Sequence, residues 1–123
     1  MFADTKAFSG FAVDDLETAQ KFYSETLGVP FTVQYGLGTL HLAGGRDTLV
    51  YPKGNHVPAT YTILNFEVDD IEATVDELVR RGVRFERYEG AQQDERAINR
   101  GEGPYIAWFK DPAGNILSVL QEK

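Results

Sequence analysis

The chain has 123 residues, of which 42% are hydrophobic, including one Trp, six Tyr and eight Phe; this is enough apolar material for one core of ordinary domain size. It contains no cysteine, so disulfides, thiolate metal ligands and a cysteine nucleophile are excluded. Its net charge of −7 argues against a nucleic-acid partner, because phosphate binding needs clustered Lys and Arg.

Targeting signals are not evident in the sequence. No run of eighteen apolar residues occurs, and residues 1–8 lack the basic segment and the apolar stretch of a signal peptide. We therefore expect a soluble, cytoplasmic protein without a membrane partner.

An internal repeat runs through the chain. Residues 11–17 read FAVDDLE and residues 66–72 read FEVDDIE, while LGVPF at 27–31 has its counterpart in RGVRF at 81–85. Two halves with the same plan are therefore predicted, each starting with a strand, a helix and a second strand.

The first half opens with alternating residue character over 7–13, which predicts a strand with one face on a core. Asp14, three residues before Glu17, is the expected N-cap of a helix. Apolar residues then recur at spacings of three and four, and Gly28 supplies the left-handed residue that ends the helix. Three more strands are predicted over 31–35, 38–43 and 48–51.

The second half repeats this order. Residues 60–68 form the predicted strand, Asp69 the N-cap and Gly82 the helix end, and strands are expected over 83–88, 105–110 and 116–120. The segment Asp111-Pro112-Ala113-Gly114 predicts a tight turn that joins the last two strands as a hairpin. Residues 89–104, rich in Gly and charge, form a long loop, and loops of this length are often lids or mobile segments.

This βαβββ order, present twice, has a family counterpart. Together with Phe22-Tyr23 followed by Leu27-Gly28, and with the DPAGN hairpin at 111–115, it resembles the vicinal-oxygen-chelate superfamily, the glyoxalase and bleomycin-resistance group. The resemblance implies an α+β fold of two tandem modules that form a partly open, cup-shaped mixed sheet with the helices outside. It implies a single domain over 1–123, with module 1 at about 5–52, a linker at 53–58 and module 2 at about 59–121.

Metal chemistry is where this chain departs from the best-known members. In glyoxalase, fosfomycin-resistance enzymes and extradiol dioxygenases the ligands come from strand positions that fall here near Phe8, Ile63, Ser118 and Tyr51. Divalent metals need His nitrogen or carboxylate oxygen at such positions. Since these residues offer neither, the resemblance implies a member without a metal, and no cofactor is expected.

Strand alternation predicts which side chains line the cup. If Phe8 and Ile63 face inward, so do Asn65 and Glu67, and the same counting points Trp108 and Ser118 inward. His41, between two leucines in a predicted strand, faces either the cup or water. The predicted ligand-binding residues are Phe8, His41, Tyr51, Ile63, Asn65, Glu67, Trp108 and Ser118.

Individual roles follow from the chemistry of these side chains. A desolvated Glu67 would serve as a general acid or base, and the alternative is a solvated carboxylate at a strand end. Trp108 offers a face for stacking or for a cation. Arg96 and Arg100 would clamp an anion if the loop closed over the cup; otherwise they belong to a solvated charge run.

Three functions remain open at this point. The first is a metal-independent protein that binds an aromatic or cationic small molecule, as the bleomycin-resistance members do. The second is a metal-free lyase or isomerase in which Glu67 or His41 moves a proton; catalytic residues are otherwise unassigned. The third is a module that serves dimerisation or regulation. Open sheet edges, and the family's many dimers, lead us to expect a homodimer.

Overall fold

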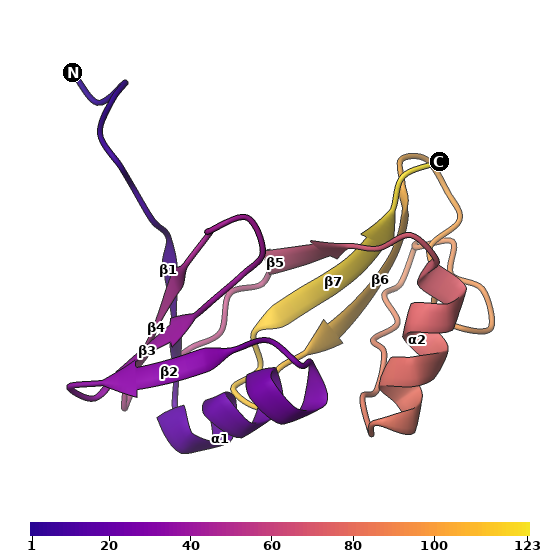
Figure 1. Ribbon diagram of the computed structural model, residues 1–123. Helices are drawn as coiled ribbons and strands as arrows, with labels where there is room; N and C mark the ends of the chain where they lie inside the picture. Colours follow the sequence, from indigo (N-terminus) through magenta and orange to yellow (C-terminus); the bar gives the residue numbers. More distant parts are fainter. The chain divides into compact units, whose positions relative to one another are not determined.

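The computed structural model describes all 123 residues, and the chain divides into two compact units, residues 1–57 and 58–123. Figure 1 shows that each unit consists of a small sheet and one helical segment. None of the helices combines the length and apolar character that crossing a membrane requires.

The first unit contains a four-stranded mixed sheet. Its strands lie in the order β1-β4-β3-β2, with β1 parallel to β4 and the other pairs antiparallel. Helix α1 continues directly into the π-helical turn η1. The elements are β1 (Gly10–Val13), α1 (Leu16–Lys21), η1 (Phe22–Thr26), β2 (Phe31–Gln34), β3 (Leu37–Leu40) and β4 (Thr48–Pro52).

The core of this unit lies between one face of the sheet and the helix. Tyr23 is fully buried, and its ring contacts the rings of Phe11, Phe22 and Phe31 at centroid distances of 5.9, 5.2 and 6.2 Å. The opposite face of the sheet carries Leu49 and Tyr51 and stays partly exposed. The apolar stripe of the first helix therefore packs against one face of the sheet and leaves the other face without a helix.

The second unit has a three-stranded mixed sheet. Strand β7 is central, parallel to β5 and antiparallel to β6. The elements are β5 (Thr62–Glu67), α2 (Ile71–Arg80), β6 (Tyr105–Lys110) and β7 (Ile116–Gln121). Two open mixed sheets with helices on one face each are the α+β architecture of two tandem modules that the repeat predicts.

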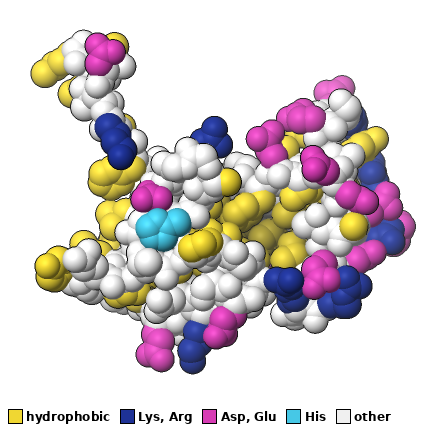
Figure 2. Space-filling view, in the orientation of Figure 1, with side chains coloured by type: hydrophobic (Ala, Val, Ile, Leu, Met, Phe, Trp, Pro, Cys, Tyr) yellow, Lys and Arg dark blue, Asp and Glu magenta, His cyan; other side chains and the backbone are white.

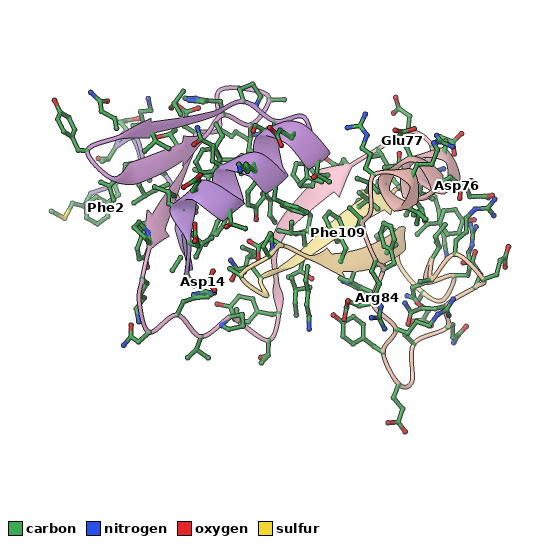
Figure 3. The ribbon with its side chains drawn as sticks, turned by 90° about the horizontal axis from the view of Figure 1, so that it is seen from below. Phe2, Asp14, Asp76, Glu77, Arg84 and Phe109 are labelled. Atoms are coloured by element: carbon green, nitrogen blue, oxygen red, sulfur yellow. The ribbon has the colours of Figure 1, made fainter.

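Helix α2 covers one face of this second sheet. Its buried residues Ile71, Val75 and Leu78 meet the buried strand residues, among them Phe109 (Figure 3), which also makes an edge contact with Phe85 at 5.5 Å. The remaining buried strand residues on that face are Ala107, Leu117 and Val119. The other face of the sheet is not covered by α2.

The helix N-caps differ from the prediction by one residue. Asp15, not Asp14, accepts a hydrogen bond from the Thr18 N–H, and Asp70, not Asp69, accepts one from the Ala73 N–H, at 3.0 and 3.1 Å. The first of these bonds lowers the pKa of Asp15. With the caps shifted, the glutamate of each repeat no longer occupies the third helical position, so no capping box forms. The left-handed Gly28 and Gly82 do follow the helices, as predicted.

The strand predicted over 83–88 is also wrong in extent. Only Phe85 forms a bridge, to Phe109, and the Glu86 N–H donates to the Trp108 carbonyl at 2.8 Å. The Tyr88 N–H is taken instead by the Gln93 side chain at 2.8 Å. The pairing with β6 is therefore limited to residues 85 and 86, because the next N–H on this side of the segment, that of Tyr88, binds a side chain instead of β6.

The predicted hairpin between β6 and β7 is present. The Gly114 N–H donates to the Asp111 carbonyl at 3.0 Å, and Gly114 has a φ of 86°. The buried Asp111 carboxylate accepts from the N–H groups of Ala113 and Asn115. These bonds satisfy the turn internally and set the register of β6 against β7.

The long loop lies against α2 and is anchored there. Ile98 is fully buried, and the Arg96 guanidinium lies 3.0 Å from the Asp76 carboxylate of the helix. Arg100 bridges Asp94 and Glu72 at 2.9 and 3.3 Å. Figure 2 shows acidic and basic side chains crowded together over this part of the unit. Both arginines are thus paired with carboxylates, which supports the charge run rather than the alternative of an anion clamp.

The cap assignment predicts a difference between two adjacent aspartates. Asp70→Ala removes the acceptor for the first turn of α2 and should lower the free energy of unfolding by about 1 kcal/mol. Asp69→Ala, one residue earlier, is the matched control and should change it by only a few tenths. Urea unfolding followed by circular dichroism measures both; equal losses would contradict the cap assignment.

Asp94 predicts a pH dependence of stability. Burial would raise its pKa, but hydrogen bonds from the Ile98 N–H, the Arg100 guanidinium and the Arg96 N–H outweigh burial and lower it. A lowered pKa in the folded state contributes stability above the unfolded value of about 3.9, which is lost as the pH falls through the folded value.

Asp94→Asn should therefore lower the unfolding temperature by roughly 4 °C at pH 7, and the difference from the unsubstituted protein should shrink as the pH falls from the unfolded value of about 3.9 through the lower folded value. Calorimetry across this range is the measurement. Glu95→Gln alters the adjacent carboxylate, which is 80% exposed, and should leave the profile unchanged. If Asp94→Asn lowers the unfolding temperature by the same amount at low pH as at pH 7, the charge of Asp94 is not the cause of the stabilisation.

Candidate ligand-binding face of the second sheet

Three of the predicted site residues form one row across the second sheet. Strand register places Asn65 of β5 opposite Ser118 of β7, and Ser118 opposite Trp108 of β6. Directly opposite residues in adjacent strands point to the same side of a sheet. This side is the one that α2 does not cover, since Phe109 and Leu117, the neighbours in sequence, lie in the core.

The polar pair in this row has a defined hydrogen-bond polarity. The Ser118 hydroxyl is fully buried and donates to the Asn65 side-chain oxygen. Because that oxygen is engaged, the Asn65 amide group presents its two N–H donors to anything that approaches the sheet. The pair therefore offers an amide donor on the same side of the sheet as the Trp108 ring, with β7 between them.

Trp108 is held from one side by Tyr88. Their ring centroids are 5.5 Å apart and their planes meet at 78°, an edge-to-face contact, and Trp108 is half-buried. Burial and, secondarily, the Glu86 charge raise the pKa of Tyr88, so its hydroxyl remains protonated at neutral pH. The two rings form an aromatic corner at the edge of the row.

Aliphatic side chains complete the same face. Ile116 and Leu120 flank Ser118 on β7, and Ile106 lies two residues before Trp108 on β6; all three are half-buried. A broad apolar surface with a few placed polar groups is the ordinary composition of a small-molecule site.

Glu67 agrees with one of its two alternatives, whereas the direction of Ile63 is not fixed. Glu67 ends β5 opposite Leu120, on the same face as the row, and is exposed, which is the alternative of a solvated carboxylate at a strand end. Ile63 lies at a register shift between Thr62 and Leu64, where β5 has one more residue than β7. A bulge of this kind interrupts strict alternation, which is why counting back from the row does not fix the direction of Ile63.

Phe8, His41 and Tyr51 belong to the first unit. Phe8 precedes β1 and is 71% exposed, outside any strand. Tyr51 lies in β4 on the face opposite the core and is 37% exposed. The eight predicted residues are therefore divided between the open faces of two sheets and one extended segment.

His41 has partners for both ring nitrogens. Nε2 lies 2.8 Å from the Thr32 hydroxyl, and Nδ1 lies 3.1 Å from the Asp47 carboxylate. The carboxylate accepts only from a protonated Nδ1, so Nε2 of the neutral ring is the acceptor for the hydroxyl. The imidazole is held in one orientation at the surface of the first unit.

The residues present do not fit a divalent metal. No group of three or more His, Cys, Asp or Glu side chains is arranged to hold one. His41 has a single carboxylate neighbour, and the row on the second sheet offers only an amide, a hydroxyl and an indole. An amide, a hydroxyl and an indole are suited to hydrogen bonding and stacking, and they are not the nitrogen and carboxylate ligands that divalent metals prefer.

Tyr88 is the side chain that sequence reasoning missed. Its contact with Trp108 depends on the short antiparallel approach of residues 85 and 86 to β6. Residue spacing carries no signal for that contact, because it joins positions on separate segments. The Arg96 and Arg100 pairings with α2 were missed for the same reason.

Comparison with solved structures shows a shared fold. TnmS3, an antibiotic binding protein from Streptomyces sp. CB03234, is 22% identical to this chain, with 98% of each chain covered and a TM-score of 0.73. The fosfomycin resistance protein FosX from Mesorhizobium loti is 12% identical, with 98% of this chain and 93% of that chain covered and a TM-score of 0.67. A glyoxalase/dioxygenase from Nostoc punctiforme is 13% identical, with 99% and 94% covered and a TM-score of 0.68.

Family assignment rests on the sequence model. No curated protein matches the chain in a direct search. The model of the Glyoxalase/Bleomycin resistance protein/Dioxygenase superfamily matches residues 7–119, nearly the whole chain. The predicted resemblance is thereby confirmed: the chain belongs to the Glyoxalase/Bleomycin resistance protein/Dioxygenase superfamily.

Proposed function

We propose that this protein binds a small organic molecule without a metal ion, on the open face of the second sheet. The observation that carries the proposal is the row of Asn65, Ser118 and Trp108, which places an amide donor and a half-buried indole on the same side of the sheet. An amide donor and an accessible part of an aromatic ring on one side of a sheet suit a planar group that bears an acceptor.

The chemistry of the surroundings narrows the ligand class. Tyr88 and the aliphatic residues favour an aromatic body, and the exposed Glu67 carboxylate, which lies on the same face, favours a positive charge at one end. The net charge of −7 acts in the same direction over a longer range. Antibiotic binding by TnmS3 and fosfomycin resistance by FosX support a small-molecule role by analogy of fold.

Trp108 provides both the test and the signal, because it is the only tryptophan. Titration with planar aromatic ketones that bear an amino group should quench or shift its emission, and calorimetry should give the affinity with and without a chelator. We expect no effect of the chelator. Trp108→Phe should weaken binding by about 1 kcal/mol or more, because the smaller ring stacks less well.

Asn65→Asp is the sharper substitution, since it keeps the shape and the acceptor for Ser118 but removes the outward N–H donors. Because the new carboxylate would also attract a cation, this comparison uses ketones without the amino group, whose binding should weaken by roughly tenfold, while neutral analogues without the carbonyl should be unaffected. Tyr35→Phe, in the first unit and 93% exposed, is the control. Unchanged affinity in both Trp108→Phe and Asn65→Asp would remove this face as the site.

A metal-free lyase or isomerase is the alternative function, favoured by the fixed imidazole of His41, which accepts a proton at Nε2. Glu67→Gln and His41→Gln separate the two functions for a ligand identified in the titrations. In a binding protein for a cation, Glu67→Gln lowers affinity. In an enzyme, substitution of the residue that acts as the general base, Glu67 or His41, leaves the affinity for the substrate unchanged and lowers turnover about a hundredfold or more.

A further inference from the structure

The first sheet carries its own group of chemically active side chains. The His41 ring lies between the Thr32 hydroxyl and the Asp47 carboxylate, with Nε2 2.8 Å from the hydroxyl and Nδ1 3.1 Å from the carboxylate. Because the carboxylate accepts the Nδ1 proton, Nε2 is left to accept the hydroxyl proton. A hydroxyl, an imidazole and a carboxylate joined in this order form the arrangement that activates an oxygen nucleophile.

Strands β2 and β3 hold the hydroxyl and the imidazole on one face. Phe31 is buried in the core, so alternation along β2 turns the adjacent Thr32 to the open face of the sheet. His41 directly follows β3, and its N–H donates to the Pro30 carbonyl at 2.9 Å, which continues the β2–β3 pairing by one residue. The short distance between the two side chains therefore follows from the strand register.

The loop 42–47 returns the carboxylate to the ring. Gly44 and Gly45 have left-handed φ values of 79° and 69°, which let the chain reverse within this loop. Asp47, the last residue before β4, then forms its ion pair with His41. The two side chains are 57% and 36% exposed, so a molecule in solution has access to the group.

A backbone donor lies next to the hydroxyl in the chain. Strand β2 is an edge strand, and since the His41 N–H bonds to Pro30, the hydrogen-bonded pairs of its ladder fall at residues 30, 32 and 34. The Val33 N–H therefore points out of the sheet, where no strand pairs with it. The N–H of the residue after a nucleophile is a common donor to the oxygen that becomes negative during acyl transfer.

We propose that Thr32, His41 and Asp47 form a hydrolytic site for neutral aryl esters of short carboxylic acids. Thr32 is the nucleophile and His41 the general base and acid, while Asp47 is a positioning residue that holds the ring in the required tautomer. This activity is independent of the ligand-binding role of the second sheet. It also differs from the lyase or isomerase alternative, in which His41 takes its proton from the substrate.

The surroundings of the hydroxyl define the substrate class. The Asp47 carboxylate repels anionic substrates, and Leu49, a half-buried apolar side chain two strands away from Thr32, lies on the same face. A neutral molecule with an apolar group fits these neighbours. Because the site is open to water, it stabilises developing charge less than a closed site would. Phenolates, which leave more readily than alkoxides, are therefore the favoured leaving groups.

The reaction balances in two steps. In the first, the Thr32 oxygen forms a bond to the acyl carbon as its proton passes to His41 Nε2; the bond to the phenolic oxygen breaks, and the phenolate takes the proton from Nε2. In the second, water attacks the acyl-threonine and gives a proton to Nε2. The bond between the acyl carbon and the threonine oxygen then breaks, and that oxygen takes the proton back. The products are a phenol and a carboxylic acid, and neither step needs an oxidant or a reductant.

Covalent labelling of the full chain with an alkyl fluorophosphonate tests the nucleophile, because the Thr32 oxygen displaces fluoride and keeps the phosphonate. Peptide mass spectrometry should place one label at Thr32. Thr32→Ser should retain the label, and Thr32→Val should abolish it. Thr39→Val is the matched control, since Thr39 lies opposite Thr32 but its hydroxyl is not bonded to His41; it should be labelled normally.

Hydrolysis of p-nitrophenyl acetate, followed by the absorbance of the released phenolate, tests the other two residues. His41→Gln should lower turnover about a hundredfold, whereas His56→Gln, which replaces the other histidine, should leave it unchanged. Asp47→Asn should lower kcat by roughly tenfold or more with little change in KM, because the ring is no longer held in the tautomer that accepts at Nε2. Asp47→Glu keeps the carboxylate and should retain most of the activity.

The outcomes separate this site from general surface reactivity. A label on a residue other than Thr32, or no label at all, would overturn the proposal. Equal turnover in the unsubstituted protein, Thr32→Val and His41→Gln would also overturn it, provided that circular dichroism shows the same fold in all three. Ligand titrations followed by Trp108 fluorescence should be unchanged in Thr32→Val, so failure of this proposal is distinguishable from failure of the binding role.

Discussion

Parallel pairing of β5 with β7 is the interaction on which the candidate site depends. It brings Asn65 opposite Ser118, although the two lie 53 positions apart in the chain, and the hairpin with β6 then adds Trp108 to the same row. A slip of one residue would turn each of these side chains to the face covered by α2. The hydrogen bond between Ser118 and Asn65 opposes such a slip, because the buried hydroxyl would lose its partner.

The same pairing separates the core-forming residues from those of the candidate site within one sheet. Apolar residues such as Phe109 and Leu117 fill the space under α2, while the alternate positions carry an amide, a hydroxyl and an indole that the core does not need. The polar groups of the open face are satisfied only in part, and the remaining donors of Asn65 are what a ligand can use. The core and the proposed ligand contacts therefore rest on different residues of the same strands.

Charged residues in this chain hold segments in place. Arg96 and Arg100 fasten the long loop to the carboxylates of α2, and Asp94 closes the loop on itself through backbone N–H groups. These contacts leave the loop packed beside the helix, with Ile98 as its apolar anchor. Some acidic side chains of the second unit therefore belong to the ion-pair network of Arg96 and Arg100, whereas others, such as Glu67, stand apart from it.

Sequence by itself determined the repeat, the strand alternation, the left-handed glycines after the helices and the Asp111–Gly114 turn, because each follows from local spacing and backbone preference. It also indicated that Asn65, Trp108 and Ser118 share one face, since alternation is strict within regular strands. The tertiary structure alone decided the features that depend on contacts between distant segments. The caps at Asp15 and Asp70 depend on where β1 and β5 end. The bulge at Ile63 depends on the pairing of β5 with β7, and the strand predicted over 83–88 is cut short because the Gln93 side chain binds the Tyr88 N–H. Tyr88 reaches Trp108, and Arg96 reaches Asp76, for the same reason: spacing along a chain specifies which face a residue occupies, but not which distant residue packs against it.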